Sequence, residues 1–261
     1  MVTSSIVSKT ASVLDFVCAR SEPLSFMQIV RATGLQKSAT HRILSILREE
    51  RLLAYDAPSQ TYTPGNRLTG WAAGVFRANN LPALCENVMD LLCERSEAHV
   101  ALSILDGISV LHLKTVEAGE PYRLAARVGE RSPAHATAAG KVLLANQAEA
   151  KRDGLISQLR LERFTEFTHT TAAAFAAELQ ATRERGYAEC DREEFLQVAG
   201  ISCAIMGAYG GPVGAISIWA QVDRYDIGAL RLHAPALMEA TNALSRRLGH
   251  GTQADGGAAT P

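Results

Sequence analysis

The chain contains 261 residues, of which 47% are hydrophobic, and its formal net charge is −1 at pH 7. This length accommodates two domains, and this composition supplies ordinary hydrophobic cores. Without an apolar run of about 18 residues or a secretory signal pattern, we expect a cytoplasmic protein that does not span a membrane. The five cysteines form no CxxC pair and predict reduced thiols, with neither disulfides nor a metal site.

The charge is unevenly distributed along the chain. Residues 1–65 contain seven Lys or Arg and five Asp or Glu, whereas residues 66–261 contain 19 and 22. A mildly basic segment before an acidic one is typical of a modular protein in which only one part contacts DNA. The asymmetry is small and carries little weight alone.

The first part of the chain has the element order of a winged helix-turn-helix domain, which we expect over residues 1–65. A first helix is predicted over residues 6–19, before Pro23. Ser25 can cap a short second helix that stops at Gly34, and a third helix follows from about residue 36.

Two β-like runs, LLAY and TYT, come next and bracket the turn-forming stretch DAPSQ. A hairpin directly after such a helix is a wing, with its tip near Ser59 and Gln60. We expect this tip to lie beside the DNA backbone or the minor groove.

The predicted third helix has two different faces. At about 100° per residue, one side is mainly apolar and carries Ala39, Thr40, Ile43, Ile46 and Leu47. The opposite side presents Lys37, Ser38, His41, Ser45 and Arg48, with Arg42 at its edge. Short polar groups suit base edges in the major groove, and cations suit phosphates. A polar helix face that is only solvated is the alternative.

The residues predicted to contact DNA are Lys37, Ser38, Thr40, His41, Arg42, Ser45 and Gln60, with Arg48 as a further phosphate contact. The segment that follows this domain, residues 66–80, carries apolar residues at the spacing of one helix face: Leu68, Trp71, Ala72, Val75 and Phe76. This pattern predicts a linker helix that pairs with its copy in a dimer and sets the half-site spacing. The alternative is a helix that packs on its own chain.

Residues 81–248 predict an α+β domain, an antiparallel sheet with helices packed on it. The expected elements are helices over 81–96, after ATAAGK, near 149–159 and over 171–185; strands over 98–105, 108–116 and 123–128 (RLAARV); a hairpin of 201–209 and 213–221; and a last helix over 226–248 that Pro235 bends or interrupts. Residues 249–261 are rich in Gly and Ala and are expected to be disordered.

No catalytic pattern is present in this second part of the chain. Gly140-Lys141 lacks the earlier glycine and the following Ser or Thr of a phosphate-binding loop, and GxSxG does not occur. The acidic residues Asp191, Glu193 and Glu194 are neighbours of like charge, which are usually solvated. We therefore expect neither enzymatic activity nor a cofactor.

Together these blocks resemble the isocitrate lyase regulator (IclR) family. The resemblance rests on QKSATHRILSIL before the wing, on VGERSPAHATAAGKVLLA, and on RERGYAECDREEF followed by GISCAIMGAYGGPVGAISI. It covers nearly the whole chain in the right order. It implies an allosteric transcription factor that forms a homodimer or a dimer of dimers, binds operator DNA, and holds a small organic or aromatic acid in a GAF-like C-terminal domain.

The resemblance also implies the residues of the effector site. Ala138, Ala139 and Gly140 begin a helix whose backbone amides suit a carboxylate. Ile201 and Cys203 supply the apolar wall, and Ser217 supplies a hydroxyl. The alternative for Cys203 is a small buried hydrophobic residue.

This sequence departs from the family pattern at three places. Trp219 replaces a second serine, and favours an aromatic or hydrophobic effector unless it is a plain core residue. Ser132 stands where a leucine often precedes the proline. An extra residue before Cys203 leaves the acidic position of the site to Asp191, which we favour, or to Glu193.

The favoured interpretation is a ligand-responsive DNA-binding regulator that acts as a repressor. Two alternatives are a metabolite-binding enzyme with a helical dimerisation segment, and a sensor that acts through protein contacts alone.

Overall fold

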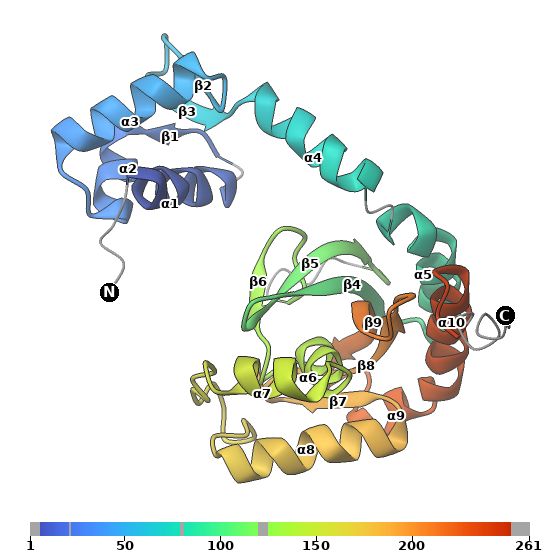
Figure 1. Cartoon of the computed structure of the whole chain (residues 1–261). Helices are drawn as coiled ribbons and strands as arrows, with labels where there is room; N and C mark the ends of the chain where they lie inside the picture. The colour runs from blue at the N-terminus through green and yellow to red at the C-terminus, as the bar shows by residue number, and fades with distance from the viewer. Residues whose placement is uncertain (1–5, 21, 79–80, 120–124, 252–261) are drawn as a thin grey trace, which may run out of the picture. The chain divides into compact units, whose positions relative to one another are not determined.

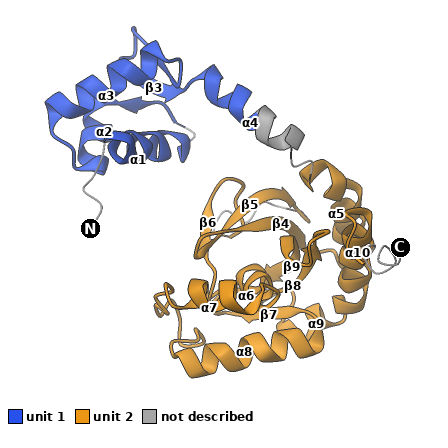
Figure 2. Cartoon of the chain, viewed as in Figure 1, with its two compact units in different colours: residues 1–80 blue, residues 81–261 orange. Residues whose placement is uncertain are grey.

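The computed structural model describes residues 6–20, 22–78, 81–119 and 125–251. It does not describe the side chains of residues 73–78. The chain divides into two compact units, residues 1–80 and 81–261 (Figures 1 and 2). Each unit has its own hydrophobic core. Within the described residues, no helix is long and apolar enough to cross a membrane.

Unit 1 is a winged helix-turn-helix followed by one further helix. Its elements are α1 (Ile6–Cys18), β1 (Leu24–Ser25), α2 (Phe26–Thr33), α3 (Lys37–Glu49), β2 (Leu53–Asp56), β3 (Thr61–Pro64) and α4 (Asn66–Ala78). The three strands pair antiparallel in the order β1-β3-β2. The strand β1 was not predicted, because a two-residue Leu-Ser strand has no alternation to reveal it.

Local signals at the ends of α2 explain the turn. Ser25 and Gln28 form a capping box, with the Gln28 side chain accepting a hydrogen bond from Ser25 N at 2.8 Å. Gly34 ends the helix in the left-handed conformation, at φ 64°. The predicted boundaries of this helix are confirmed.

The buried face of α3 differs slightly from its sequence projection. Thr40, Ile43, Leu44 and Leu47 are buried, whereas Ile46 is 43% exposed. A projection gives the width of an apolar stripe, but the neighbouring helices decide which edge of the stripe is covered.

The start of α4 is fixed to the rest of unit 1. Gly65 lies against the backbone of Arg51, so closely that a Cβ there would overlap it. Arg67 pairs with Glu50 and also lies over the Trp71 ring, 5.2 Å from its centroid. Leu68 packs on the core of unit 1, whereas Trp71 is 52% exposed. Of the other predicted stripe residues, Ala72 is also exposed, and Val75 and Phe76 have side chains outside the described residues.

Unit 2 is an α+β domain around one six-stranded sheet. Its elements are α5 (Leu81–Ser96), β4 (His99–Asp106), β5 (Ser109–Val116), β6 (Arg131–Pro133), α6 (Ala138–Ala145), α7 (Glu149–Ile156), α8 (Ala172–Arg185), β7 (Ala188–Asp191), β8 (Val198–Met206), β9 (Pro212–Gln221), α9 (Ile227–Arg231) and α10 (Ala234–Arg247). The sheet order is β6-β5-β4-β9-β8-β7, and every pair is antiparallel.

The two faces of this sheet carry different helices, as Figure 1 shows. On one face, Ile201, Cys203 and Ile218 pack with residues of α5 and α10. On the other face, Ala215 packs with residues of α6 and α8, including Phe175. Alternation along each strand sends successive side chains to opposite faces.

One expected strand of unit 2 is wrong, and another strand was not predicted. The predicted strand over residues 123–128 is not formed by its described part: residues 125–128 make bends and a turn, with Ala126 at φ 51°, and the edge strand is β6 instead. Strand β7 was not predicted, because it is short and partly polar. As expected, the last helical segment is interrupted before Pro235, which lies in the first turn of α10. Residues 252–261 of the expected disordered tail lie outside the described residues.

Candidate functional site

The exposed face of α3 is polar and basic. Lys37, Ser38, His41, Arg42 and Ser45 are all exposed, as predicted for a surface that reads DNA. This face is adjacent to α2, because the His41 ring meets the Phe26 ring edge-on at 6.3 Å. Short polar side chains and cations therefore lie together on one solvent-facing side of the helix.

Thr40 is not part of this surface, contrary to prediction. Its side chain is completely buried, and its hydroxyl donates to the backbone oxygen of Gln36 at 3.1 Å. Position 40 lies on the inner side of α3 between the buried Ile43 and Leu44, so Thr40 supports the helix from within the core.

The wing has an exposed turn at its tip. Asp56 accepts hydrogen bonds from the backbone amide and the hydroxyl of Ser59, and these bonds hold the pKa of that carboxyl below its usual range. Gln60 follows in the left-handed conformation at φ 54° and is exposed. Arg48, predicted as a phosphate contact, is exposed at the C-terminal end of α3 and lies over the Tyr55 ring of the wing.

Unit 2 contains a small cavity between the sheet and the start of α6. The described residues that line it are Ala101, His112, Ala125, Ala126, Thr137, Ala138, Ala139, Cys190, Glu194, Val198, Gly200, Ser217 and Trp219. Its volume is about 60 Å³. Four of the predicted effector-site residues are among its lining: Ala138, Ala139, Ser217 and Trp219.

One part of the cavity wall is apolar. The Trp219 indole stacks on the His99 ring, with centroids 4.4 Å apart and an interplanar angle of 22°. Ala101 and Val198 pack with Trp219, and Phe195 lies against the same cluster. This wall offers a flat aromatic surface to a ligand.

Another part of the wall is a polar chain of four side chains. His112 Nδ1 lies 2.9 Å from Ser103 Oγ, and His112 Nε2 lies 3.1 Å from Ser132 Oγ. The Ser132 hydroxyl also acts on Glu194, because it lowers the pKa of that carboxyl against the larger effect of burial. Burial lowers the pKa of His112 to about 4 and raises that of Glu194 to about 7. The imidazole is therefore neutral at pH 7.

The start of α6 closes the cavity. Thr137 caps the helix by accepting a hydrogen bond from Gly140 N at 3.2 Å. The backbone amides of Ala138 and Ala139 belong to the first turn, where a helix presents partial positive charge. Gly140 itself does not line the cavity; it allows close packing, because a Cβ there would overlap the backbone of Ala134.

The remaining predicted effector residues lie elsewhere. Ile201 and Cys203 project into the core on the opposite face of the sheet, because β8 turns its odd-numbered side chains away from the cavity. Asp191 pairs with Arg192, with Oδ1 to Nε at 2.9 Å, and does not line the cavity. Ser132 reaches the site only through His112 and Glu194.

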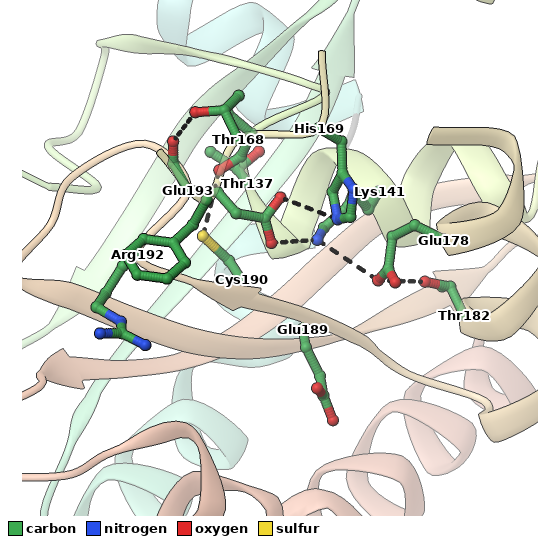
Figure 3. Close-up of polar contacts among 12 residues, drawn as sticks. Thr137, Lys141, Thr168, His169, Glu178, Thr182, Glu189, Cys190, Arg192 and Glu193 are labelled. Atoms are coloured by element: carbon green, nitrogen blue, oxygen red, sulfur yellow. Dashed lines mark hydrogen bonds and ion pairs between the residues drawn. The ribbon is translucent and has the colours of Figure 1, made fainter. Parts of the chain in front are cut away.

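The other acidic candidate, Glu193, is buried in a separate charged cluster (Figure 3). Its Oε1 lies 2.6 Å from Lys141 Nζ, and its Oε2 lies 3.8 Å from His169 Nε2. Lys141 also lies 3.5 Å from Glu178 Oε1 of α8. Thr168 donates to the Glu193 carbonyl at 2.7 Å. The cluster holds α6, α8 and the segment after β7 together.

Sequence reasoning missed two functional candidates, His112 and Glu194. Glu194 was set aside as one of several like-charged loop residues, and its burial depends on contacts distant in sequence. The alternation of the 108–116 strand could have placed His112 inside the sheet, next to Ser103 across the hairpin. Among the described residues, no group of three or more His, Cys, Asp or Glu side chains could hold a metal ion.

The chain matches known families over most of its length. Residues 6–57 match the IclR helix-turn-helix domain, and residues 74–246 match the family described as bacterial transcriptional regulator IclR C-terminal. It is 30% identical to the glycerol operon regulatory protein of Streptomyces coelicolor over 94% of this chain and 96% of that protein. It is 28% identical to the transcriptional regulator XynR of Escherichia coli over 94% and 97%.

Solved structures have the same fold. A putative IclR transcriptional regulator from Silicibacter aligns over 95% of this chain and 97% of that one, with a TM-score of 0.79 and 23% identity. An IclR homologue from Microbacterium hydrocarbonoxydans, complexed with 4-hydroxybenzoate, aligns over 94% and 99%, also at 0.79 and 23%. The predicted fold and the predicted family are both confirmed, and the relatives are regulators rather than enzymes. The chain is a member of the IclR family of transcriptional regulators.

Proposed function

We propose that this chain represses transcription by binding operator DNA through α3 and the wing, and that a small aromatic acid in the unit 2 cavity changes this binding. The observation that carries the DNA part is the exposed set of polar and cationic side chains on α3. Ser38 and His41 contact base edges, and Lys37, Arg42 and Arg48 contact phosphates. Gln60 at the tip of the wing contacts the adjacent backbone or minor groove.

The cavity supports the effector part of the proposal. Its walls combine the Trp219 ring with the first-turn amides of Ala138 and Ala139, which suit an aromatic body and a carboxylate. One solved homologue supports the same ligand class, because it is complexed with 4-hydroxybenzoate.

The small volume of the cavity is evidence that the protein changes conformation when the effector binds. Its 60 Å³ is room for roughly two water molecules, which is less than a benzoate needs. A ligand therefore favours conformations in which the walls have moved apart, and it shifts the population toward them. Homodimerisation through the exposed face of α4 near Trp71 transmits this shift to two DNA half-sites.

The DNA part is tested by fluorescence anisotropy with the intergenic DNA beside the protein's own gene. Three phosphate-contacting cations per protomer, about six in a dimer, predict an affinity that falls about a thousandfold between 50 and 200 mM salt. The double substitution Ser38→Ala/His41→Ala abolishes the preference for this DNA over unrelated DNA, whereas Ser12→Ala on the exposed side of α1 does not. Salt-independent or absent binding would favour a sensor that acts through protein contacts alone.

A further inference from the structure

Glu194 is the carboxyl group among the described residues that line the cavity, and none of those lining residues is a lysine or an arginine. Lys141, the cation of α6, is paired with Glu193 and Glu178. A ligand in the cavity therefore meets the Glu194 carboxyl, and no lysine or arginine of the described lining residues accompanies that carboxyl.

The hydrogen bonds around Glu194 run in one direction. Neutral His112 can use one ring nitrogen as a donor and the other as an acceptor. The Ser132 hydroxyl lowers the pKa of Glu194, as a donor to its carboxylate does, and the His112 tautomer consistent with this donates from Nε2 to Ser132 and accepts at Nδ1 from Ser103. Each donor in this chain is used once, and the chain ends on the Glu194 carboxyl. Because Glu194 also lines the cavity, a ligand there can donate a further hydrogen bond to its carboxyl.

Contacts of the residues that precede Glu194 also fix its position. Its neighbour Glu193 is held by Lys141 at 2.6 Å, and Thr165 and Thr168 donate to the backbone carbonyls of Arg192 and Glu193 at 2.6 and 2.7 Å. An acceptor that is held in place and half-buried discriminates against a ligand that leaves it unpaired.

We propose that Glu194 is a specificity-determining residue, which accepts a hydrogen bond from a hydroxyl group on the effector and so selects hydroxylated aromatic acids over the same acids without the hydroxyl. This inference rests on the proposed effector site. The aromatic body packs on Trp219, and the hydroxyl points to the end of the Ser103–His112–Ser132 chain.

The test measures the dissociation constants of benzoate, 3-hydroxybenzoate and 4-hydroxybenzoate for the full chain by calorimetry. Wild-type protein is expected to bind one of the two hydroxybenzoates at least about tenfold more tightly than benzoate. In Glu194→Met, which has a similar size and no acceptor oxygen, this preference falls to about twofold or less. Glu194→Gln keeps an acceptor oxygen and therefore keeps the preference. The control Glu239→Met, on the exposed side of α10, behaves as wild type.

The outcomes separate this inference from the proposed function. Equal binding of all three acids by the wild-type protein overturns the role of Glu194 and leaves the effector site intact, and this comparison needs no variant. A preference that survives in Glu194→Met also overturns it. Failure of all three acids to bind overturns both the inference and the proposed aromatic-acid effector.

Discussion

Lys141 Nζ lies 2.6 Å from Glu193 Oε1, and the two side chains are only 1% and 6% exposed although they are 52 residues apart in sequence. Lys141 belongs to α6, whose first turn closes the cavity, and Glu193 immediately precedes the cavity residue Glu194. One buried ion pair thus connects two parts of the cavity wall. The geometry of the site depends on a pair that does not line it.

Replacing Lys141 by methionine is expected to destabilise the fold strongly. It leaves the Glu193 carboxylate buried without its cation, which costs about 3–5 kcal/mol in the free energy of unfolding. Urea denaturation of the full chain measures this loss. The double variant Lys141→Met/Glu193→Leu recovers most of it, because neither charge remains buried without a partner. Single and double variants of equal stability would show that the pair has no such role.

Gly140→Ala is expected to disrupt the packing of α6. The added Cβ overlaps the backbone of Ala134, which cannot move as easily as a side-chain end, so we expect a loss of at least about 2 kcal/mol in unfolding free energy. Gly154→Ala in α7 is the matched control, since no atom lies within 4 Å of its Cβ. That substitution is expected to stabilise the protein by about 0.5–1 kcal/mol. A fully stable Gly140→Ala protein would contradict the close approach.

The two titratable groups of the polar chain give opposite dependences on pH. The pKa of Glu194 rises from 4.5 to about 7 on folding, so the folded state holds the proton more tightly and stability falls as the pH rises from about 4.5 to 7. The pKa of His112 falls from 6.5 to about 4, so stability falls as the pH drops through that window. The third titratable lining group described, Cys190, stays protonated because burial raises its pKa to about 12.

Glu194→Gln isolates the acidic contribution. Relative to wild type, the variant gains stability between pH 5 and pH 8, by on the order of 1–2 kcal/mol after allowance for partial exposure. Urea denaturation at pH 5, 6, 7 and 8, at constant ionic strength, measures this difference. A difference that stays constant across the series would mean that Glu194 titrates as an ordinary exposed glutamate.

Tryptophan fluorescence can report directly on the cavity. The chain has two tryptophans, Trp71 in α4 and Trp219 in the cavity wall. In Trp71→Phe the remaining indole lies beside the proposed effector, so 4-hydroxybenzoate is expected to change its emission in a saturable way. In Trp219→Phe the same titration probes only α4. An emission that does not change in Trp71→Phe, at concentrations where calorimetry detects binding, would place the ligand elsewhere.

Local signals in the sequence were sufficient for most of the fold. The capping residue Ser25, the left-handed Gly34 and the turn at Asp106-Gly107 act through neighbouring residues, so their elements could be predicted from short stretches of chain. The family blocks then supplied the order of the domains. The resemblance to the family implied Ser217 and Trp219 for the effector site, and both line the cavity because they lie on the same face of the regular strand β9.

The acidic position of the site could not be predicted in the same way. The connection after β7 has an irregular path, and its register is set by the contact between Glu193 and the distant Lys141. Counting along the sequence therefore favoured Asp191, whereas the structure brings Glu194 to the cavity. Likewise, the pairing of β8 with β9 decides on which face of the sheet Cys203 lies. The apolar character of the β8 residues does not decide it.

The most direct test of the account measures DNA affinity with and without ligand on the same protein. Anisotropy titrations of the intergenic DNA are performed with the full chain alone and at saturation with the hydroxybenzoate that binds most tightly. The account predicts that the dissociation constant for DNA changes by about 5- to 150-fold, and that DNA changes the affinity for the ligand by the same factor. A DNA affinity that stays the same in the ligand-saturated protein would contradict the central claim that the cavity controls the DNA-binding unit.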